Sequence, residues 1–337
     1  MPGFRHWRET PAGRCPVVAT ELRLADRLGA WKARWGIGRL SYLVPPGLYA
    51  VGEPAADDPV VVTANYKMSY DVVRRSLAGR SVWLLVLETH GINVWCAAGK
   101  GTFGTGELVR RVEQTGLERV VAHRTLVLPL LGAAGVRAVE VKKRTGFEVR
   151  FASVRAADLP AYLEGGRQAT PGMRELSFST GERLVLIPIE IVQGVLNSLP
   201  LLAVIFLATA FLSGSFSAGA GFLAVAGYLG ALLAGAVVTP LLLPWLPTRS
   251  FTVKGAVVGS VWVLLFWALT GRDWGSLTLA AIFLILPAVS AFFALNFTGS
   301  TPFTSRSGVK REMRLALPVM ALALVIGLVL LAAEVLR

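Results

Sequence analysis

Residues 188–212 read PIEIVQGVLNSLPLLAVIFLATAFL, and this apolar run decides the class of the second half of the chain. About 20 apolar residues in an α-helix cross the ~30 Å hydrocarbon core of a bilayer, so the run is long enough to span one. Similar runs follow at residues 217–243, 252–270, 274–297 and 315–336. We therefore predict an all-α bundle of five transmembrane helices over residues 188–337, in a multi-pass membrane protein.

Small residues recur four apart inside these runs, as Gly227, Ala231 and Gly235 and again as Gly255 and Gly259. This spacing lets helices approach closely in lipid, so we predict close helix packing at these positions. A separate polar set, Glu190, Gln193 and Asn197, shares one face at the start of the first run. We interpret that set as interfacial or interhelical polar groups.

The charged residues of the 337-residue chain lie mostly before this membrane half. Residues 1–183 hold 26 of the 34 Lys and Arg and 17 of the 21 Asp and Glu. With the first half inside the cell, the inner loops would carry Arg249, Lys254, Arg306, Lys310, Arg311 and Arg314. The outer side would carry only Arg272 and Arg337. The positive-inside rule then predicts a cytoplasmic N-terminal domain, an inner-membrane location and an outer C-terminus; no apolar signal-peptide region opens the chain.

Two function classes are disfavoured by composition. Cys15 and Cys96 are the two cysteines of the sequence, too few for an iron–sulfur cluster, a four-cysteine zinc site or a disulfide framework. The net charge is +13, but the sequence has no long Lys/Arg run, zinc-finger spacing or other nucleic-acid motif. We therefore expect no iron–sulfur cluster in this chain and no nucleic-acid partner, and we interpret Cys15 as structural.

Apolar, β-branched runs alternate with helix-like stretches in the first half. The expected strands are residues 59–64, 81–87, 119–122 with 126–128, and 148–154; the expected helices are 68–78, 105–115 and 134–144. This alternation is typical of a parallel sheet covered on both faces. We predict a Rossmann-like α/β domain at 46–165, an N-terminal extension at 1–45 and a linker at 166–187.

The carboxyl ends of such strands are where ligands bind. On this reading they present Thr63 and Asn65, then Glu88 and Thr89, then His123.

The segment GINVWCAAGKGTFGT, residues 91–105, follows the second expected strand. Gly99, Gly101 and Gly104 match G-x-G-x-x-G, but they start about eleven residues after the strand, and no acidic residue follows at the spacing of a dinucleotide site. What remains is a small-residue helix that presents a thiol, Cys96. Lys100 would share its face and help to hold a thiolate.

Such a thiolate can serve as a nucleophile or as a ligand to a soft or borderline metal. A nucleophile needs a base, and the nearby candidates, His90 and His123, lack recognisable catalytic spacing.

The run NVWCAAGK, residues 93–100, resembles the cap-helix signature of the HgcA family, the corrinoid proteins of microbial mercury methylation. The further stretches that carry the resemblance are PGLYAVGEP (46–54), VVVTANYK (60–67), ETHGIN (88–93), GKGTFGT (99–105), NFTGSTPFTS (296–305) and GVKREMR (308–314). The large subunit of the corrinoid iron–sulfur protein of acetyl-CoA synthesis is a related family, but its members also carry a cluster domain and a TIM barrel.

The resemblance implies a corrinoid-binding Rossmann-like domain whose cofactor is a cobalamin-type cobamide. It implies that Cys96 is the catalytic residue and the lower axial ligand of cobalt, and that the donating thiolate favours transfer of the upper methyl group to Hg(II), as a carbanion equivalent or by a radical path. The residues expected around the corrinoid are Asn65, Thr89, Asn93, Val94, Trp95, Cys96, Ala97, Ala98, Gly99, Lys100, Gly101, Thr102, Phe103, Gly104 and His123.

The implied partners are an HgcB-like ferredoxin with two 4Fe–4S clusters as electron donor, a methyl-donor methyltransferase system, the Hg(II) substrate and the lipid bilayer. His90 is not expected to bind cobalt, because Asn93 stands where the D-x-H-x-x-G pattern of other cobalamin proteins has glycine.

Two alternatives stay open. The chain could be a corrinoid methyl carrier for another acceptor, of the acetyl-CoA-pathway type, or a membrane transporter with a regulatory α/β domain, which would bind no corrinoid.

Overall fold

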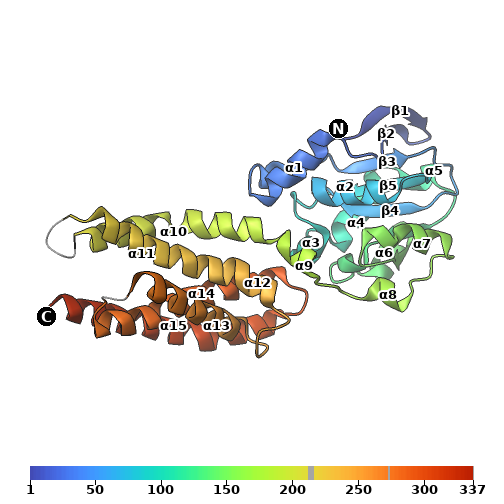
Figure 1. Ribbon diagram of the computed structural model, residues 1–337. Coiled ribbons are helices and arrows are strands. Elements are labelled where there is room, and N and C mark those ends of the chain that lie inside the picture. Colours follow the sequence, from blue (N-terminus) through green and yellow to red (C-terminus); the bar gives the residue numbers. More distant parts are fainter. Residues whose placement is uncertain (212–215, 272–273, 337) are drawn as a thin grey trace. The chain divides into compact units, whose positions relative to one another are not determined.

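The computed structural model describes residues 1–211, 216–271 and 274–336 (Figure 1). The chain divides into two compact units, Met1–Leu176 and Ser177–Arg337. The first is an α/β unit and the second is helical, as predicted.

A mixed sheet forms the centre of the first unit. Seven strands are present among the described residues, in the order β1 (Phe4–Thr10), β2 (Gly13–Val18), β3 (Gly47–Val51), β5 (Val82–Leu87), β4 (Val60–Ala64), β6 (Thr125–Leu128) and β7 (Glu148–Phe151). The pairs β5–β4, β4–β6 and β6–β7 are parallel, whereas β3 is antiparallel to β5 and β1 to β2. The prediction of a parallel sheet is therefore right for β5, β4, β6 and β7 and wrong for the seven-stranded sheet as a whole.

The first 45 residues supply β1 and β2 to this sheet, together with α1 (Leu24–Arg34) and the 3-10 turn η1 (Arg39–Ser41). A buried ion cluster ties α1 to α2 (Lys67–Ser76). Asp26 pairs with Lys67 at 2.6 Å and with Arg74 at 2.9 Å, and Asp71 pairs with both cations. Because each buried charge faces opposite charges, the cluster joins two helices without an unpaired ion.

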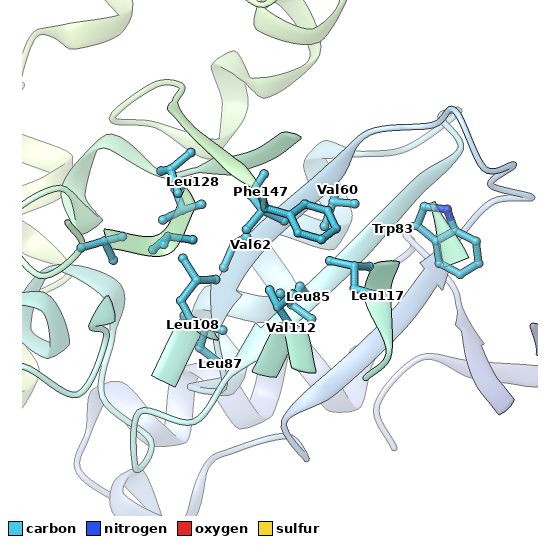
Figure 2. Close-up of a cluster of buried hydrophobic side chains, with 14 of the residues drawn as sticks. Val60, Val62, Trp83, Leu85, Leu87, Leu108, Val112, Leu117, Leu128 and Phe147 are labelled. Carbon is cyan, nitrogen blue, oxygen red and sulfur yellow. The ribbon is translucent and has the colours of Figure 1, made fainter. Parts of the chain in front are cut away.

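Alternate residues of the central strands enter two separate cores. Val60, Val62, Trp83, Leu85 and Leu87 belong to the first core, with residues of α4 (Thr105–Gln114) and α6 (Ala138–Thr145). Figure 2 shows these five side chains together with Leu108 and Val112 of α4. The intervening residues Val61, Val82, Leu84 and Val86 pack under α2 and α7 (Leu159–Glu164). Strands buried on both faces read as continuous apolar runs, which is why these strands were predictable. Further short helices of the unit are η2 (Leu130–Gly132), η3 (Ala156–Asp158) and α8 (Pro171–Arg174).

The first part of one expected strand, residues 119–122, is wrong, whereas its second part, residues 126–128, lies in β6. Residues Leu117–Val120 form a helical turn, α5, and β6 begins only at Thr125. Gly116 has a φ of 56°, and its carbonyl accepts the Arg119 N–H at 2.9 Å, which starts the turn. Leu117 and Val120, three residues apart, then share the buried side. The short apolar run fits one turn of helix as well as a strand, and the neighbouring glycine decides between them.

The second unit contains the predicted membrane-type helices. Its elements are α9 (Thr180–Leu184), α10 (Ile187–Ala210), α11 (Ala218–Leu233), the π-helix η4 (Ala234–Val238), α12 (Thr239–Leu242), α13 (Phe251–Thr270), α14 (Ser276–Asn296), η5 (Phe297–Ser300) and α15 (Arg306–Val335). Five stretches of the described chain are long and apolar enough to cross a membrane: Thr180–Ala210, Ala218–Leu242, Phe251–Thr270, Ser276–Ser300 and Arg306–Val335. The prediction of five apolar helices is confirmed, with α15 starting nine residues earlier than the expected 315.

The small residues of this unit lie where helices meet. A Cβ at Gly255 would come within 2.5 Å of Ala294 Cβ, and one at Gly259 within 2.6 Å of Ser290 Cβ. A Cβ at Gly227 would come within 2.9 Å of the Phe266 ring. The prediction of close packing through small residues is therefore confirmed for α11, α13 and α14.

Glu190 reaches Ser300 Oγ at 3.1 Å, an interhelical contact. Of the residues used to argue orientation, Arg272 and Arg337 lie outside the described residues, as does residue 212 at the end of the first expected span.

Candidate functional site

A seven-residue helix, α3 (Val94–Lys100), carries Cys96. Asn93 caps its start, because the Asn93 side chain accepts the Cys96 backbone N–H at 2.9 Å. The inner face of α3 buries Val94, Ala97 and Ala98 in the first core. The other four helix residues are exposed: Trp95, Cys96, Gly99 and Lys100. The helix therefore presents the thiol and the ammonium group on one open face, as their four-residue spacing predicts.

The loop before α3 is held from the next strand. Asn65, fully buried after β4, accepts hydrogen bonds from the Thr89 N–H at 3.0 Å and the Thr89 hydroxyl at 2.9 Å. Its Nδ2 donates to Glu88 Oε1 at 2.7 Å. The Thr89 hydroxyl also reaches the Ile92 carbonyl at 2.7 Å, one residue before the cap. Asn65 and Thr89 thus lie together at the carboxyl edge of β4 and β5, but their polar groups are already engaged in holding this loop.

His90 lies in the same loop with its side chain exposed. Its φ of 55° and the φ of 68° at Gly91 turn the chain sharply between β5 and α3. A positive φ is uncommon outside glycine, and here the His90 N–H is fixed by Glu88 Oε1 at 2.7 Å. The residue therefore serves the turn.

Glu107 of α4 supports this loop from the other side. Its carboxylate accepts the Glu88 backbone N–H at 2.8 Å and pairs with Arg111 at 2.8 Å and with Arg110. Burial by itself raises the pKa of Glu107, but the bonds from the Glu88 N–H and the two arginines outweigh it and hold that pKa below its ordinary value. The carboxylate is thereby kept ionised as a fixed acceptor.

The far end of α3 is anchored by glycines. Gly101 ends the helix with a φ of 85°, and the Ala97 carbonyl then accepts the Thr102 and Phe103 N–H groups at 3.0 and 3.2 Å. Phe103 is fully buried. After β6, Gly135 lies so close that a Cβ there would overlap the Phe103 carbonyl oxygen and reach 3.0 Å from Ala98 Cα. This close approach sets the position of α3 against the segment that follows β6.

Gly104 completes the end of this segment as the residue before α4. A Cβ at Gly104 would come within 2.7 Å of the Gly101 carbonyl oxygen. The three glycines of the apparent G-x-G-x-x-G pattern therefore have structural roles. Gly101 makes the turn that ends α3, Gly104 allows close packing before α4, and Gly99 leaves the exposed face of α3 without a side chain.

His123 lies at the wrong edge of the sheet for the expected site. Because residues 117–120 are helical, His123 precedes β6, and its Nε2 lies 2.8 Å from the carbonyl of Asp58, which precedes the parallel strand β4. Asn65 follows that strand. The expectation that His123 and Asn65 share one edge is therefore wrong, and we leave His123 out of the proposed site.

The two cysteines lie in opposite environments. Cys15, on β2, is 3% exposed, and its S–H donates to the Leu48 carbonyl at 3.3 Å. Burial raises the pKa of the Cys15 thiol to about 12, so this thiol stays protonated and unreactive. Cys96 is exposed. Within residues 1–211, 216–271 and 274–336, no three His, Cys, Asp or Glu side chains gather into a metal site. A metal bound at Cys96 would therefore need its other ligands from a cofactor or a partner.

Sequence reasoning missed three supports of the α3 segment: Gly135, Glu107 and Gly132. A Cβ at Gly132 would come within 2.5 Å of the Phe103 ring. The GAAG run at 132–135 carried a signal, since glycines after a strand often mark a close backbone approach. Glu107, in the first turn of an expected helix, looked like an ordinary helix-start acid. Its bond to Glu88 depends on tertiary contact, and no local pattern reports that.

Comparison with known proteins places the relationship in the first unit. Residues 39–161, which include all of α3, match a family model described as the CO dehydrogenase/acetyl-CoA synthase delta subunit. The acetyl-CoA decarbonylase/synthase complex subunit gamma of Methanopyrus kandleri is 39% identical over 124 residues, which are 36% of this chain and 26% of that protein. The same-named subunit of Archaeoglobus fulgidus is 35% identical over 123 residues, with the same shares.

The chain therefore spans about a quarter of the length of these curated relatives. The expected relation to the proteins of acetyl-CoA synthesis is confirmed for this region. The helical second unit has no counterpart in the matched residues.

Proposed function

We propose that the chain is a membrane-anchored, corrinoid-dependent methyltransferase that transfers a methyl group from the cobalt of a bound cobamide to Hg(II). One observation carries the proposal: Cys96 lies exposed on a short helix whose other face is locked into the core beside the carboxyl edge of the sheet. This edge is where α/β sheets of this kind bind ligands. The NVWCAAGK run and the matched family support the choice of a corrinoid.

The residues on the open face of α3 fit a broad, flat cofactor. Gly99 has no side chain, so nothing at that position projects between the helix and a planar ring. Trp95, 39% exposed, offers an apolar surface beside the thiol. A thiolate is a soft ligand suited to a cofactor metal, and the described residues bring no competing cluster of ligands.

Each residue around Cys96 then has a role in the proposed site. Cys96 Sγ would hold the cobalt of a bound corrinoid, and Lys100 would place a positive charge on the same exposed face of α3. Asn93 fixes the first turn of the helix, while Asn65 and Thr89 hold the loop before it. Val94, Ala97, Ala98 and Phe103 anchor the helix, so the thiol is presented on a rigid element. A bound corrinoid supplies the cobalt that accepts and donates the methyl group.

The proposed reaction needs electrons that this chain does not store. Cys15 is buried and Cys96 is assigned to cobalt, so no thiols remain for a cluster. We therefore propose a separate ferredoxin with two 4Fe–4S clusters as reductant, and a methyltransferase system as methyl donor. We also propose a location in the cytoplasmic membrane with the first unit on the cytoplasmic side. The five apolar helices and the basic residues between them support this proposal.

The test compares Cys96→Ala with Cys15→Ala, which removes the other thiol. Full-length proteins are purified anaerobically, loaded with cobalamin and examined by absorbance spectroscopy. Wild type and Cys15→Ala should share a spectrum of thiolate-bound cobalt, whereas Cys96→Ala should lose it. Cells that express each variant with the ferredoxin partner should form methylmercury with wild type and Cys15→Ala only. Equal spectra and equal methylmercury formation for all three proteins would refute the assignment.

A second candidate function is that of a corrinoid methyl carrier for an acetyl-CoA-forming complex. The similarity to acetyl-CoA decarbonylase/synthase subunits favours it. It predicts the same Cys96 spectrum but no methylmercury, and methyl transfer to a purified carbon-monoxide-condensing enzyme instead. Supplying the loaded protein with either acceptor separates the two functions.

A further inference from the structure

A groove lies between three helices of the second unit. Its volume is about 790 Å³, within the ~300–1,000 Å³ usual for ligand sites. The floor is α14, with Phe283, Pro287 and Ala288, and the walls are α13 and α15. The lining is overwhelmingly apolar, and alanines at positions 256, 288, 291, 316 and 323 make the hollow.

The groove follows one face of α15 from Gly308 to Ala323. Fifteen residue steps at about 1.5 Å each give a length of ~22 Å. Half of a ~30 Å hydrocarbon core is ~15 Å, so the groove is long enough to accommodate an acyl chain through one whole leaflet.

The polar end of the groove carries two unpaired cations. Arg249, just before α13, and Arg311, on α15, both line it and are exposed. Neither guanidinium group makes a hydrogen bond or an ion pair with any described residue. Glu312 lies between the two helices, but its carboxylate is engaged by Ser250 Oγ at 2.7 Å and by Thr252 N–H at 2.8 Å. The acid therefore joins α13 to α15 and leaves both guanidinium groups available.

We propose that this groove binds one anionic phospholipid, with its phosphate against Arg249 and Arg311 and an acyl chain along α14. The inference rests on the second unit lying in a bilayer, and it is independent of the chemistry proposed for Cys96. Guanidinium groups match phosphate oxygens in geometry and charge, and basic pockets between membrane helices bind acidic headgroups.

The lining argues against a path for mercury. It contains no cysteine, and its one sulfur atom is the Met320 thioether. Hg(II) is a soft ion that prefers thiolate ligands, so a groove of alanine, leucine and phenylalanine side chains gives it nothing to bind. Acyl chains, in contrast, need only apolar surface and space.

The experiment uses the full-length protein in detergent and native mass spectrometry. Phosphatidylglycerol is the probe, phosphatidylcholine the zwitterionic comparison, and glycerol phosphate the headgroup without chains. The test variant is R249Q/R311Q. The matched control is K310Q/R314Q, which removes two charges from the same end of α15 but outside this groove. Because both altered arginines are exposed, folding is not at risk.

Wild type and K310Q/R314Q should retain one phosphatidylglycerol in preference to phosphatidylcholine, and should bind no glycerol phosphate. A basic residue at the membrane surface contributes about fivefold in lipid affinity, so R249Q/R311Q should bind phosphatidylglycerol about 25-fold more weakly. Equal loss in both variants, equal affinity for the two lipids, or a lipid-free dimer that occupies the groove would overturn the proposal. Corrinoid loading of R249Q/R311Q should be unchanged, so failure here would leave the assignment of Cys96 standing.

Discussion

Asn93 accepts the backbone N–H of Cys96 through its side-chain oxygen, at 2.9 Å. The residue before the helix thus fixes the orientation of the residue that carries the thiol. A helix of seven residues is too short to be stable alone, so α3 depends on this cap and on the burial of its inner face. The rigidity of the thiol is a property of its surroundings.

Removing the cap should loosen α3 specifically. Asn93→Ala is expected to cost about 1 kcal/mol, which makes local opening about fivefold more frequent. Hydrogen exchange followed by mass spectrometry should show faster exchange in the α3 peptide than in α4. Asn93→Asp keeps the accepting oxygen and should restore protection. Unchanged exchange in Asn93→Ala would show that the cap does not hold the helix.

The glycine against Ala98 offers a sharper test of how α3 is positioned. Gly135→Ala puts a Cβ onto the Phe103 carbonyl, and because backbone cannot yield as a flexible side chain does, we expect a loss of about 1–3 kcal/mol. The control is Gly106→Ala on α4, where nothing lies within 4 Å. An alanine inside a helix should stabilise it by up to about 1 kcal/mol. Thermal unfolding of both full-length variants should therefore move in opposite directions, and a shared direction would contradict the packing account.

The parts of this fold that sequence predicts are those with a strong local pattern. β4 and β5 are unbroken apolar runs, and five long helices have membrane-type composition. β1 reads FRHWRET and exposes most of its residues at the sheet edge, so neither alternation nor hydrophobicity marks it. The cluster of Asp26, Lys67 and Arg74 is equally invisible, since charges normally indicate a solvated surface and only the tertiary fold brings these three together.

The candidate site likewise has features that the local sequence predicts and features that depend on tertiary contacts. Helical spacing alone places Cys96 and Lys100 on one face, and the residue before the helix, Asn93, is a typical cap. The engagement of Asn65 by Thr89 and the close approach of Gly135 depend on which strands are neighbours. The misplacement of His123 followed from one turn of helix that the local sequence leaves ambiguous.

The buried ion cluster should make stability depend on pH at both extremes. Burial raises the pKa of Asp26, but bonds from Lys67 and the Arg23 N–H and the charges of Lys67 and Arg74 outweigh it, so that pKa lies below its ordinary value. The stabilisation that ionised Asp26 contributes is complete above its unfolded pKa of about 3.9 and is lost as pH falls through the lowered folded pKa.

Burial lowers the pKa of Lys67, yet its bonds to Asp26 and Asp71 raise that pKa overall. Its stabilisation is complete below about 10.4 and is lost as pH rises through the raised folded value.

Asp26→Asn leaves Lys67 and Arg74 with only Asp71 as an acidic partner. Breaking a buried pair by removing one partner costs about 3–5 kcal/mol, so the melting temperature at pH 7 should fall by several degrees. The acid limb of the stability profile should flatten as well. Glu9→Gln, in the exposed pair with Arg14, should leave the melting temperature nearly unchanged. Similar effects of the two changes would mean that the cluster is not a special support of α1.

Stability should depend on both polar groups of the buried Asn65 amide, the oxygen that accepts and the NH2 that donates. Asn65→Ala removes the acceptor for Thr89 and the donor to Glu88, and an unsatisfied buried group costs about 1–3 kcal/mol. Asn65→Asp keeps the acceptor but sets a second carboxylate against Glu88. We therefore expect Asn65→Asp to be destabilised at pH 7 and partly rescued near pH 5, as measured by thermal unfolding. Asn65→Ala should show no such rescue, and a pH-independent defect in both would refute the two-sided role.

The two thiols should differ in reactivity by their burial alone. With iodoacetamide at pH 7.5, the protein without corrinoid should be alkylated at the exposed Cys96 and not at Cys15, whose pKa burial raises to about 12. Denaturant should expose Cys15 to the same reagent, so Cys96→Ala should remain unlabelled until it unfolds.

If cobalt binds Cys96 as proposed, loading with cobalamin should protect that thiol without altering Cys15. Peptide mass spectrometry reads each site separately. Labelling of Cys96 at an unchanged rate after loading would argue that the cofactor does not engage the thiol, even if it binds the domain.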